Sequence, residues 1–257
     1  MNKVRTVPLA LIRDTRYSRV LNYPATDAAE VDARLRELAA IGVTALRFSG
    51  SSLIEGIDIL GKGCVGLVTQ AVCEGGLVAL KIRRADADRP SMEEEARLLR
   101  VANSVNVGPG LISATRNFLV MEMFDGLPLF RWANGPPRRH SLVRRVLSDL
   151  LQSCFRLDAI GLDHGELSHA PRNVLVGAGG RTCIVDFETA SMVRRVANVT
   201  SLLQYFLFGS ISGSLQIEGW TRRRRDILRS LTKYKHGSSL ESYQHVLRAL
   251  RLGDYAA

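Results

Sequence analysis

Short apolar runs rich in residues that favour β-strands occur from Ile57 to Phe124, and this pattern is typical of β-strands. The runs are 57–60, 65–72, 76–83, 110–116 and 118–124. Glycine-rich turns separate the first three runs, and the sequence Cys73-Glu74-Gly75-Gly76 favours a tight hairpin. We therefore expect a β-rich region here.

One helix is predicted to interrupt these strands, at residues 91–102. Ser91 and Glu94 have the spacing of a capping box, which would start the helix. Glu95 precedes Leu98 and Leu99 by three and four positions, so its side chain is expected on the apolar, inward face of the helix.

After Pro136 and Pro137 the apolar residues follow a helical spacing. Helices are predicted at 141–160, 197–209, 216–233 and 239–251, and a hairpin at 173–176 and 183–187. A β-rich half followed by a helical half predicts an α+β protein with two lobes that share a cleft.

Residues 27–41 carry apolar side chains at helical spacing, with Asp27 and Glu30 suited to cap the start and Gly42 to end the helix. We expect residues 1–50 to form an N-terminal helical appendage. The two lobes would then occupy residues 51–125 and 126–257.

The composition is that of an ordinary globular protein, with 46% hydrophobic and 23% charged residues among 257. No run approaches the roughly 18–20 apolar residues that a membrane helix needs. Pro8, Arg13 and Asp14 interrupt the N-terminal segment and disfavour a signal peptide. The four cysteines are scattered, which argues against a disulfide framework and against a zinc site. We expect a cytoplasmic protein without membrane association.

The net charge of +10 comes largely from arginine, including the run Arg222–Arg225. Such a run is most often a solvated surface, but it also suits nucleic acid, an acidic protein or a phosphate-rich ligand. No aromatic residue interrupts the run, so base stacking is not indicated there.

A glycine-rich segment with the pattern G-x-G-x-x-G is formed by Gly61, Gly63 and Gly66, and Val68 follows it. The pattern alone is weak. Here it lies between two predicted strands, whereas a dinucleotide-binding fingerprint opens a helix. A glycine turn between strands is the kind that lies over ATP phosphates, because backbone without side chains can approach the anion closely.

Lys81 lies thirteen residues after Val68, inside the apolar segment Val78-Ala79-Leu80-Lys81. Burying a lysine in a strand is costly unless the ammonium group has a partner. One alternative is an edge-strand lysine that faces solvent. The other pairs Lys81 with a helix glutamate and with nucleotide phosphates, and Glu95 is the expected partner.

The segment 162–176, "LDHGELSHAPRNVLV", is followed by Asp186-Phe187. In this order and with the motifs above, the chain resembles the eukaryotic-like protein kinase superfamily across residues 51–210. The sequence "HGELS" is more similar to the HGDLS form of RIO-type atypical kinases than to the HRDLK form of conventional ones. The segments "IVDFETAS" and "NVTSLLQYFLF" resemble archaeal predicted serine/threonine protein kinases.

The resemblance implies a bilobal kinase-like fold, with a small β-rich N-lobe and a reduced, mainly helical C-lobe. It also implies an ATP- and Mg²⁺-dependent phosphotransferase in which Lys81 anchors phosphates, Asp186 and Asn173 bind metal, and Glu166 replaces the catalytic aspartate. The implied nucleotide-binding residues are Gly61, Gly63, Gly66, Val68, Ala79, Lys81, Glu122 and Phe124, the last two through the backbone that would bind adenine.

The implied phosphoacceptor is a Ser or Thr hydroxyl of a protein substrate, or of the protein itself. A catalytically impaired, nucleotide-binding pseudokinase scaffold is an alternative, and so is a small-molecule kinase of the choline or aminoglycoside type. The basic charge also leaves an RNA or ribosomal partner open.

Three departures from the kinase pattern bear on activity. Glu166 stands in place of Asp, it is seven residues from Asn173 rather than five, and Glu188 replaces the glycine of the DFG motif with no A-P-E sequence after it. We expect the longer acid and the longer loop to offset each other. His164 is expected to brace the loop, and Asp163 to face solvent.

Overall fold

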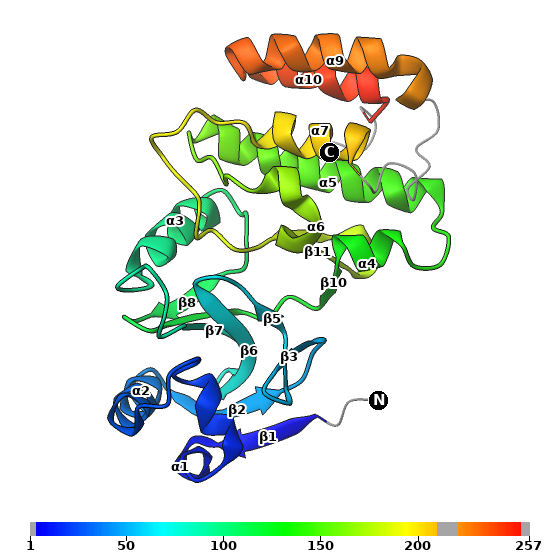
Figure 1. Ribbon diagram of the computed structural model, residues 1–257. Coiled ribbons are helices and arrows are strands. Elements are labelled where there is room, and N and C mark those ends of the chain that lie inside the picture. Colours follow the sequence, from blue (N-terminus) through cyan, green and yellow to red (C-terminus); the bar gives the residue numbers. More distant parts are fainter. Residues whose placement is uncertain (1–3, 210–219, 253–257) are drawn as a thin grey trace. The chain divides into compact units, whose positions relative to one another are not determined.

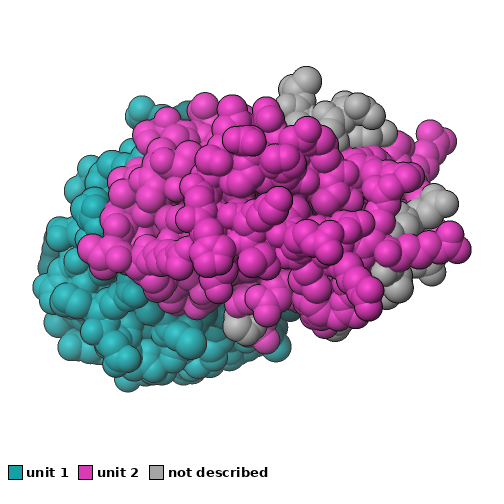
Figure 2. Space-filling model, turned by 90° about the horizontal axis from the view of Figure 1, so that it is seen from above, with its two compact units in different colours: residues 1–100, 109–123 teal, residues 101–108, 124–257 magenta. Residues whose placement is uncertain are grey.

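The computed structural model describes residues 4–209 and 220–252 (Figure 1). The chain forms two compact units, coloured separately in Figure 2. Unit 1 comprises residues 1–100 and 109–123, and unit 2 comprises 101–108 and 124–257. Unit 1 is built on a β-sheet and unit 2 is mainly helical, which confirms the predicted α+β class with a β-rich part followed by a helical part.

Unit 1 contains most of the strands. Its elements are β1 (Arg5–Pro8), α1 (Leu9–Ile12), the 3-10 turn η1 (Arg16–Val20), α2 (Ala28–Ala40), β2 (Val43–Phe48), β3 (Ser52–Ile54), β4 (Ile57–Ile59), β5 (Gly61–Lys62), β6 (Gly66–Cys73), β7 (Gly76–Arg83), β8 (Leu111–Ala114), β9 (Phe118–Glu122) and α3 (Glu93–Asn103), which ends in unit 2.

The main sheet of unit 1 has the strand order β1-β2-β6-β7-β9-β8, with β5 paired to β6, and every pairing is antiparallel. The β7 strand is therefore interior, between β6 and β9, and Lys81 lies on it opposite Val68 and Leu119. An interior position excludes the alternative of an edge-strand lysine that faces solvent.

The first fifty residues are an integral part of unit 1. They were expected to form a helical appendage, but β1 and β2 extend the main sheet, and Leu46 and Phe48 of β2 pack in the same core as Leu67 of β6. The strand β2 was missed because its pairing partner lies more than twenty residues further along the chain.

The helix α2 begins at its predicted cap, since the Asp27 carboxylate accepts hydrogen bonds from the N–H groups of Ala29 and Glu30. The Glu30 side chain does not complete a capping box but pairs with Arg34 at 2.8 Å. The buried Arg34 also donates to the backbone carbonyls of Leu21 and Arg83, and this satisfied guanidinium fixes α2 against the sheet.

Unit 2 contains the remaining elements. They are β10 (Gly126–Pro128), α4 (Leu129–Ala133), α5 (His140–Ala159), the 3-10 turn η2 (Leu167–His169), α6 (Ala170–Asn173), β11 (Val174–Gly177), the 3-10 turn η3 (Ala178–Gly180), β12 (Thr182–Ile184), α7 (Asn198–Phe208), α9 (Trp220–Gly237) and α10 (Leu240–Leu250).

Most helices of unit 2 agree with the predicted segments. The α5 helix buries apolar residues at helical spacing, including Leu147, Leu151 and Cys154. Residues 216–219 of the predicted helix 216–233 lie outside the described residues, and α9 covers its remainder. The predicted hairpin is present as β11–β12, and β10, which was not predicted, extends it to a three-stranded sheet.

Among residues 4–209 and 220–252, none of the helices combines the length and the apolar character that crossing a membrane requires.

Candidate active site

The glycine-rich segment of unit 1 forms a strand-turn-strand hairpin, as predicted. Gly61 of β5 pairs with Val68 of β6, and the N–H of Gly63 donates to the carbonyl oxygen of Gly66 at 2.8 Å. A Cβ atom at Gly66 would lie 3.0 Å from both Cγ and Cε of Lys81. Glycine is therefore required here to let the β6 backbone approach the lysine side chain.

Lys81 and Glu95 form a buried ion pair within unit 1, in agreement with the expected pairing. The Lys81 Nζ lies 2.8 Å from Oε1 and 2.9 Å from Oε2 of Glu95, and each residue is 4% exposed. The low exposure makes the pair interdependent, because removing either charge takes away the ion-pair partner of a buried group. Glu95 thus holds the ammonium group at a defined position at the sheet.

The start of α3 differs from the prediction. Ser91 accepts a hydrogen bond from the Glu93 N–H at 3.4 Å, but the Glu94 carboxylate forms an exposed ion pair with Arg97 at 2.7 Å instead of closing a capping box. The helix therefore begins at Glu93, and Glu95 lies in its first turn with its side chain directed to Lys81.

The residues expected at the nucleotide share one face of the main sheet. Ala79 and Lys81 are two positions apart on β7, and Val68 on β6 is directly opposite Lys81. Side chains at such positions point to the same side. The structure therefore brings Val68, Ala79 and Lys81 together.

The backbone expected to bind adenine is partly engaged. The N–H of Glu122, in unit 1, donates to the carbonyl of Gly110 at 2.8 Å, so this N–H is not the donor for a base. Phe124 belongs to unit 2, where a Cβ at Gly126 or Gly177 would approach its ring to 2.7 or 3.1 Å. The Phe124 ring thus packs on the small sheet β10-β11-β12.

Glu166 and Asn173 meet in unit 2 although seven positions separate them. The turn η2 and the short helix α6 lie between them and bring the chain back, so that Asn173 Nδ2 donates to Glu166 Oε2 at 3.0 Å. The two residues beyond the usual kinase spacing are taken up in helical turns. Asn173 is buried and can hold the Glu166 carboxylate in one orientation.

Asp186 follows β12 in a left-handed backbone conformation, with a φ angle of +69°. Non-glycine residues rarely adopt this conformation, and such strain concentrates at functional sites. The Val185 N–H donates to the Asn173 carbonyl at 2.9 Å, which fixes the position of Asp186 relative to Asn173. The carboxylates of Asp186 and Glu188 approach within 4.8 Å of each other.

These side chains suit a hard divalent cation. Carboxylate and amide oxygens, available here from Asp186, Glu188 and Asn173, are the ligands that Mg²⁺ prefers. Glu188 was noted in the sequence only as a replacement for glycine, and its proximity to Asp186 makes it a further candidate ligand.

His164 braces the loop from a fully buried position, as predicted. Its Nε2 lies 3.1 Å from the carbonyl oxygen of Val185, and its Nδ1 accepts from the Glu166 N–H at 3.4 Å. A carbonyl only accepts, so Nε2 carries the proton and the ring is neutral. Burial lowers the pKa of His164, which keeps the ring in this state.

Asp163 does not face solvent, and this prediction was wrong. Its side chain is 7% exposed and accepts from Arg194 Nε at 2.5 Å and from the Ala197 N–H at 2.9 Å. Its backbone forms a β-bridge with Ser191. Gly165, with φ +88°, is needed beside this pair because a Cβ would collide with the Arg194 guanidinium. The segment after Asp186 is thereby fixed to the loop.

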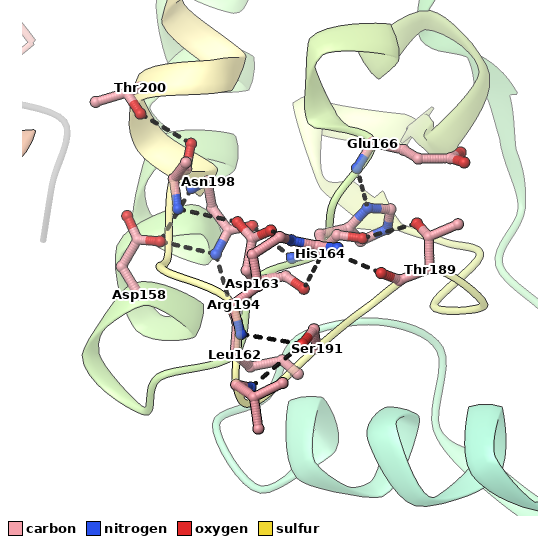
Figure 3. A network of polar contacts seen from close by, with 12 residues as sticks. Asp158, Leu162, Asp163, His164, Glu166, Thr189, Ser191, Arg194, Asn198 and Thr200 are labelled. Carbon is pink, nitrogen blue, oxygen red and sulfur yellow. Dashed lines mark hydrogen bonds and ion pairs between the residues drawn. The ribbon is translucent and has the colours of Figure 1, made fainter.

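A network of buried polar groups extends from this loop into the helices of unit 2 (Figure 3). The backbone N–H of His164 donates to Asn198 Oδ1 at 2.9 Å. Asn198 Nδ2 donates in turn to Asp158 Oδ1 and to the Leu162 carbonyl oxygen, both at 2.7 Å. The Tyr234 hydroxyl donates to Asp158 Oδ2 at 2.8 Å. The network connects α5, α7 and α9 to the loop that carries Glu166.

Desolvation by burial raises the pKa of Asp158, and the surrounding donors oppose this shift. Neither Asp158 nor Asn198 was predicted from the sequence. A signal was available, since Asp158 interrupts the apolar face of α5 and Asn198 stands at the first position of α7, but neither pattern names a partner 40 residues away.

Comparison with known proteins gives one distant similarity. No family model matches the chain. Over 166 residues, or 58% of its length, the chain is 26% identical to an inactive leucine-rich repeat receptor-like serine/threonine-protein kinase of Arabidopsis thaliana. The match spans 25% of that relative. The similarity supports a distant protein-kinase-like relationship, consistent with the β-rich and helical units described above.

Proposed function

We propose that the protein is an ATP- and Mg²⁺-dependent phosphotransferase, an atypical, RIO-like serine/threonine kinase that transfers the γ-phosphate to a protein hydroxyl, its own included. The observation that carries the proposal is the 3.0 Å contact between Glu166 and Asn173. The seven-residue spacing between Glu166 and Asn173, in place of the usual five, is the departure from the kinase pattern that bears most on activity. The contact supports activity because the acid and the amide still lie together despite the longer loop.

In this proposal the residues of unit 1 bind the nucleotide. Lys81, held by Glu95, neutralises charge on the α- and β-phosphates, and the turn Gly61–Gly66 offers backbone N–H groups to the phosphates. Val68 and Ala79 present small apolar surface to the base from the same sheet face. The buried Lys81–Glu95 pair supports this assignment, because burying a charged pair on a central strand is costly and a lysine with a purely structural role would not require that position.

The residues of unit 2 act on the phosphoacceptor. A Mg²⁺ ion would supply charge stabilisation of the phosphates, and Asp186, Asn173 and Glu188 are the oxygen donors that would hold it. Glu166 accepts the proton of the incoming hydroxyl, while the Asn173 amide keeps its carboxylate oriented. His164 stays neutral and fixes the Glu166 backbone.

The proposed enzyme needs no conventional activation segment. The segment 187–197 is short. The Asp163–Arg194 ion pair and the Asp163–Ser191 β-bridge already fix this segment to the loop that carries Glu166. A reducing compartment such as the cytoplasm suits the protein, because all four cysteines are free thiols.

A second candidate function is a nucleotide-binding pseudokinase scaffold. The observation that favours it is the similarity to a receptor-like kinase that is described as inactive. This candidate predicts that ATP stabilises the protein against heat without being turned over.

The proposal is tested by transfer of γ-labelled phosphate from Mg-ATP to the protein itself and to general protein acceptors. The wild type is expected to incorporate label and the D186N variant to lose it, since the amide removes the metal-binding charge while asparagine tolerates the left-handed backbone. D226N, which changes an exposed acid, is the matched control. Equal, background incorporation by wild type and D186N, with nucleotide binding retained, would support the scaffold instead.

A further inference from the structure

The positive charge of the chain is concentrated in one helix. The α9 helix contains seven Lys and Arg residues and one Asp, and it therefore carries a net charge of +6 out of the +10 of the whole chain. The kinase proposal makes no use of this charge.

Basic side chains form a continuous stripe along α9. Arg222, Arg225, Arg229, Lys233 and His236 recur every three or four residues, so they share one face, and all five are exposed. We call these five residues the basic stripe; at 1.5 Å per residue it is about 21 Å long.

The opposite face of α9 is occupied. Ile227, Leu231 and Tyr234 are buried, and the helix packs against α10 and α7 (Figure 1). Arg224 lies outside the stripe, and its guanidinium is 4.2 Å from the centre of the Phe208 ring. The basic stripe is therefore the solvent side of a helix that is already anchored.

This arrangement disfavours the helix itself. The first turn of α9 contains arginines and no acid, although the helix dipole favours acids there. Neighbours in the stripe repel at i, i+3 and i, i+4 spacing, and the nearest countercharge in the helix is Asp226, which lies 3.5 Å from Arg229 in an exposed pair. Anionic groups of a binding partner would neutralise these side chains and so remove the repulsion between them.

The chemistry of the stripe selects among anionic partners. A membrane-bound helix needs apolar side chains that enter the lipid, but the apolar face of α9 is buried in the protein. A protein interface needs an apolar or aromatic anchor, and the stripe has none. Planar guanidinium groups bind phosphates in a bidentate manner, and three of the five stripe residues are arginine.

We propose that the basic stripe of α9 binds the phosphate backbone of double-stranded nucleic acid, independently of base sequence. A stripe of about 21 Å matches roughly six phosphates along one strand at 3.4 Å of rise each. Single strands are disfavoured as the ligand because the stripe contains no Phe, Tyr or Trp side chain on which successive bases could stack. Duplex RNA and duplex DNA offer the same phosphates, and the experiment separates them.

The test measures binding of the full chain to labelled 20-base-pair duplex RNA, the matching duplex DNA and one single strand, by fluorescence anisotropy at several salt concentrations. The stripe variant is R222Q/R225Q/R229Q. The matched control R5Q/R36Q/R100Q removes three exposed arginines of unit 1 and the same net charge.

Wild type and control are expected to bind a duplex with a slope of log K against log salt of about −3 to −4, since the stripe has four Lys and Arg residues and each phosphate that one of them neutralises contributes about −0.9. The stripe variant should lose about three units of slope and about 10²-fold in affinity at 0.1 M salt. Because exposed glutamines remove repulsion, its helical circular dichroism should be unchanged or increased.

Equal duplex affinity of stripe variant and control would overturn the proposal, and so would an absence of duplex binding by the wild type. Tighter binding to the single strand than to either duplex would contradict the duplex assignment. Vesicles that contain phosphatidylserine serve as the last arm, and binding to them but not to duplexes would assign the stripe to a membrane surface instead. A charge-retaining variant, R222K/R225K/R229K, should keep most of the salt slope; loss of the slope in this variant would also contradict phosphate binding.

Discussion

The Tyr234 hydroxyl is expected to stabilise unit 2 through its hydrogen bond to Asp158, and Y234F removes this group alone. The ring stays, and the carboxylate loses one of its four donors, the others being the N–H and Nδ2 of Asn198 and the N–H of Val199. Tyr243 provides the control, because its buried hydroxyl has no hydrogen-bond partner among the described residues.

The two substitutions should have opposite or clearly unequal effects. A hydrogen bond to a charged group contributes about 1.5–3 kcal/mol, so Y234F should lower the free energy of unfolding by about this amount. Y243F removes a hydroxyl that was desolvated without compensation, and it should be neutral or raise the free energy of unfolding by up to about 1 kcal/mol. The stacking of Tyr243 on Phe155, at 4.3 Å, would persist in the phenylalanine variant.

Urea unfolding followed by circular dichroism measures both variants, with the midpoint and slope compared to the wild type. The Y234F deficit should shrink on acidification, because burial raises the pKa of Asp158 and protonation of the carboxylate weakens its demand for donors. Equal midpoints for Y234F and Y243F at neutral pH would refute the idea that the Asp158 network supports the loop of Glu166.

Three further predictions concern the site itself. Burial lowers the pKa of His164, so the contribution of the neutral ring to the free energy of unfolding should be complete above a pH of about 6.5 and should decline as the pH falls towards the folded pKa. In urea unfolding, the H164Q variant should lack this part of the decline in stability. G66A should weaken Mg-ATP binding about tenfold in calorimetry by pressing on Lys81, whereas G75A, where a Cβ meets nothing within 4 Å, should not; equal affinities would contradict the close approach. K81M should lower the free energy of unfolding by about 3–5 kcal/mol because the buried Glu95 carboxylate loses its ion pair at 2.8 Å, and K81M/E95L should recover most of it; a double variant no more stable than K81M would oppose the pairing.

The parts of the site that the sequence predicted well depend on short-range periodicity. The position of Lys81 inside an apolar segment, and that of Glu95 relative to Leu98 and Leu99, led to the predicted pairing of Lys81 with Glu95. The glycine hairpin followed from its place between two strands. The glycine hairpin joins two consecutive strands, and Lys81 and Glu95 are only 14 positions apart.

The parts that were missed depend on partners far along the chain. Asp163 has the sequence context of an exposed acid, and its burial becomes favourable through Arg194 and the Ala197 N–H, which lie 31 and 34 residues later. The strands β1 and β2 were missed because β2 pairs with β6, and a four-residue strand such as β1 has too few positions to show alternation. Local patterns do not contain these pairings.

The contact between Glu166 and Asn173 has a simple physical basis in spite of the irregular spacing. Two more residues separate the acid from the amide than in the kinase pattern, but helical turns rise only about 1.5–2 Å per residue, so two extra residues add little length. The expectation that the longer acid and the longer loop offset each other agrees with this geometry.

The most direct test of the central claim is the rate of phosphate transfer from Mg-ATP by E166Q, compared with wild type, together with nucleotide affinity of both proteins. Glutamine keeps the size of the side chain and a hydrogen bond to Asn173 but cannot accept the proton of the hydroxyl. Transfer should fall by about 10²–10⁴-fold with nucleotide affinity unchanged. Equal rates of transfer by E166Q and wild type would contradict the account.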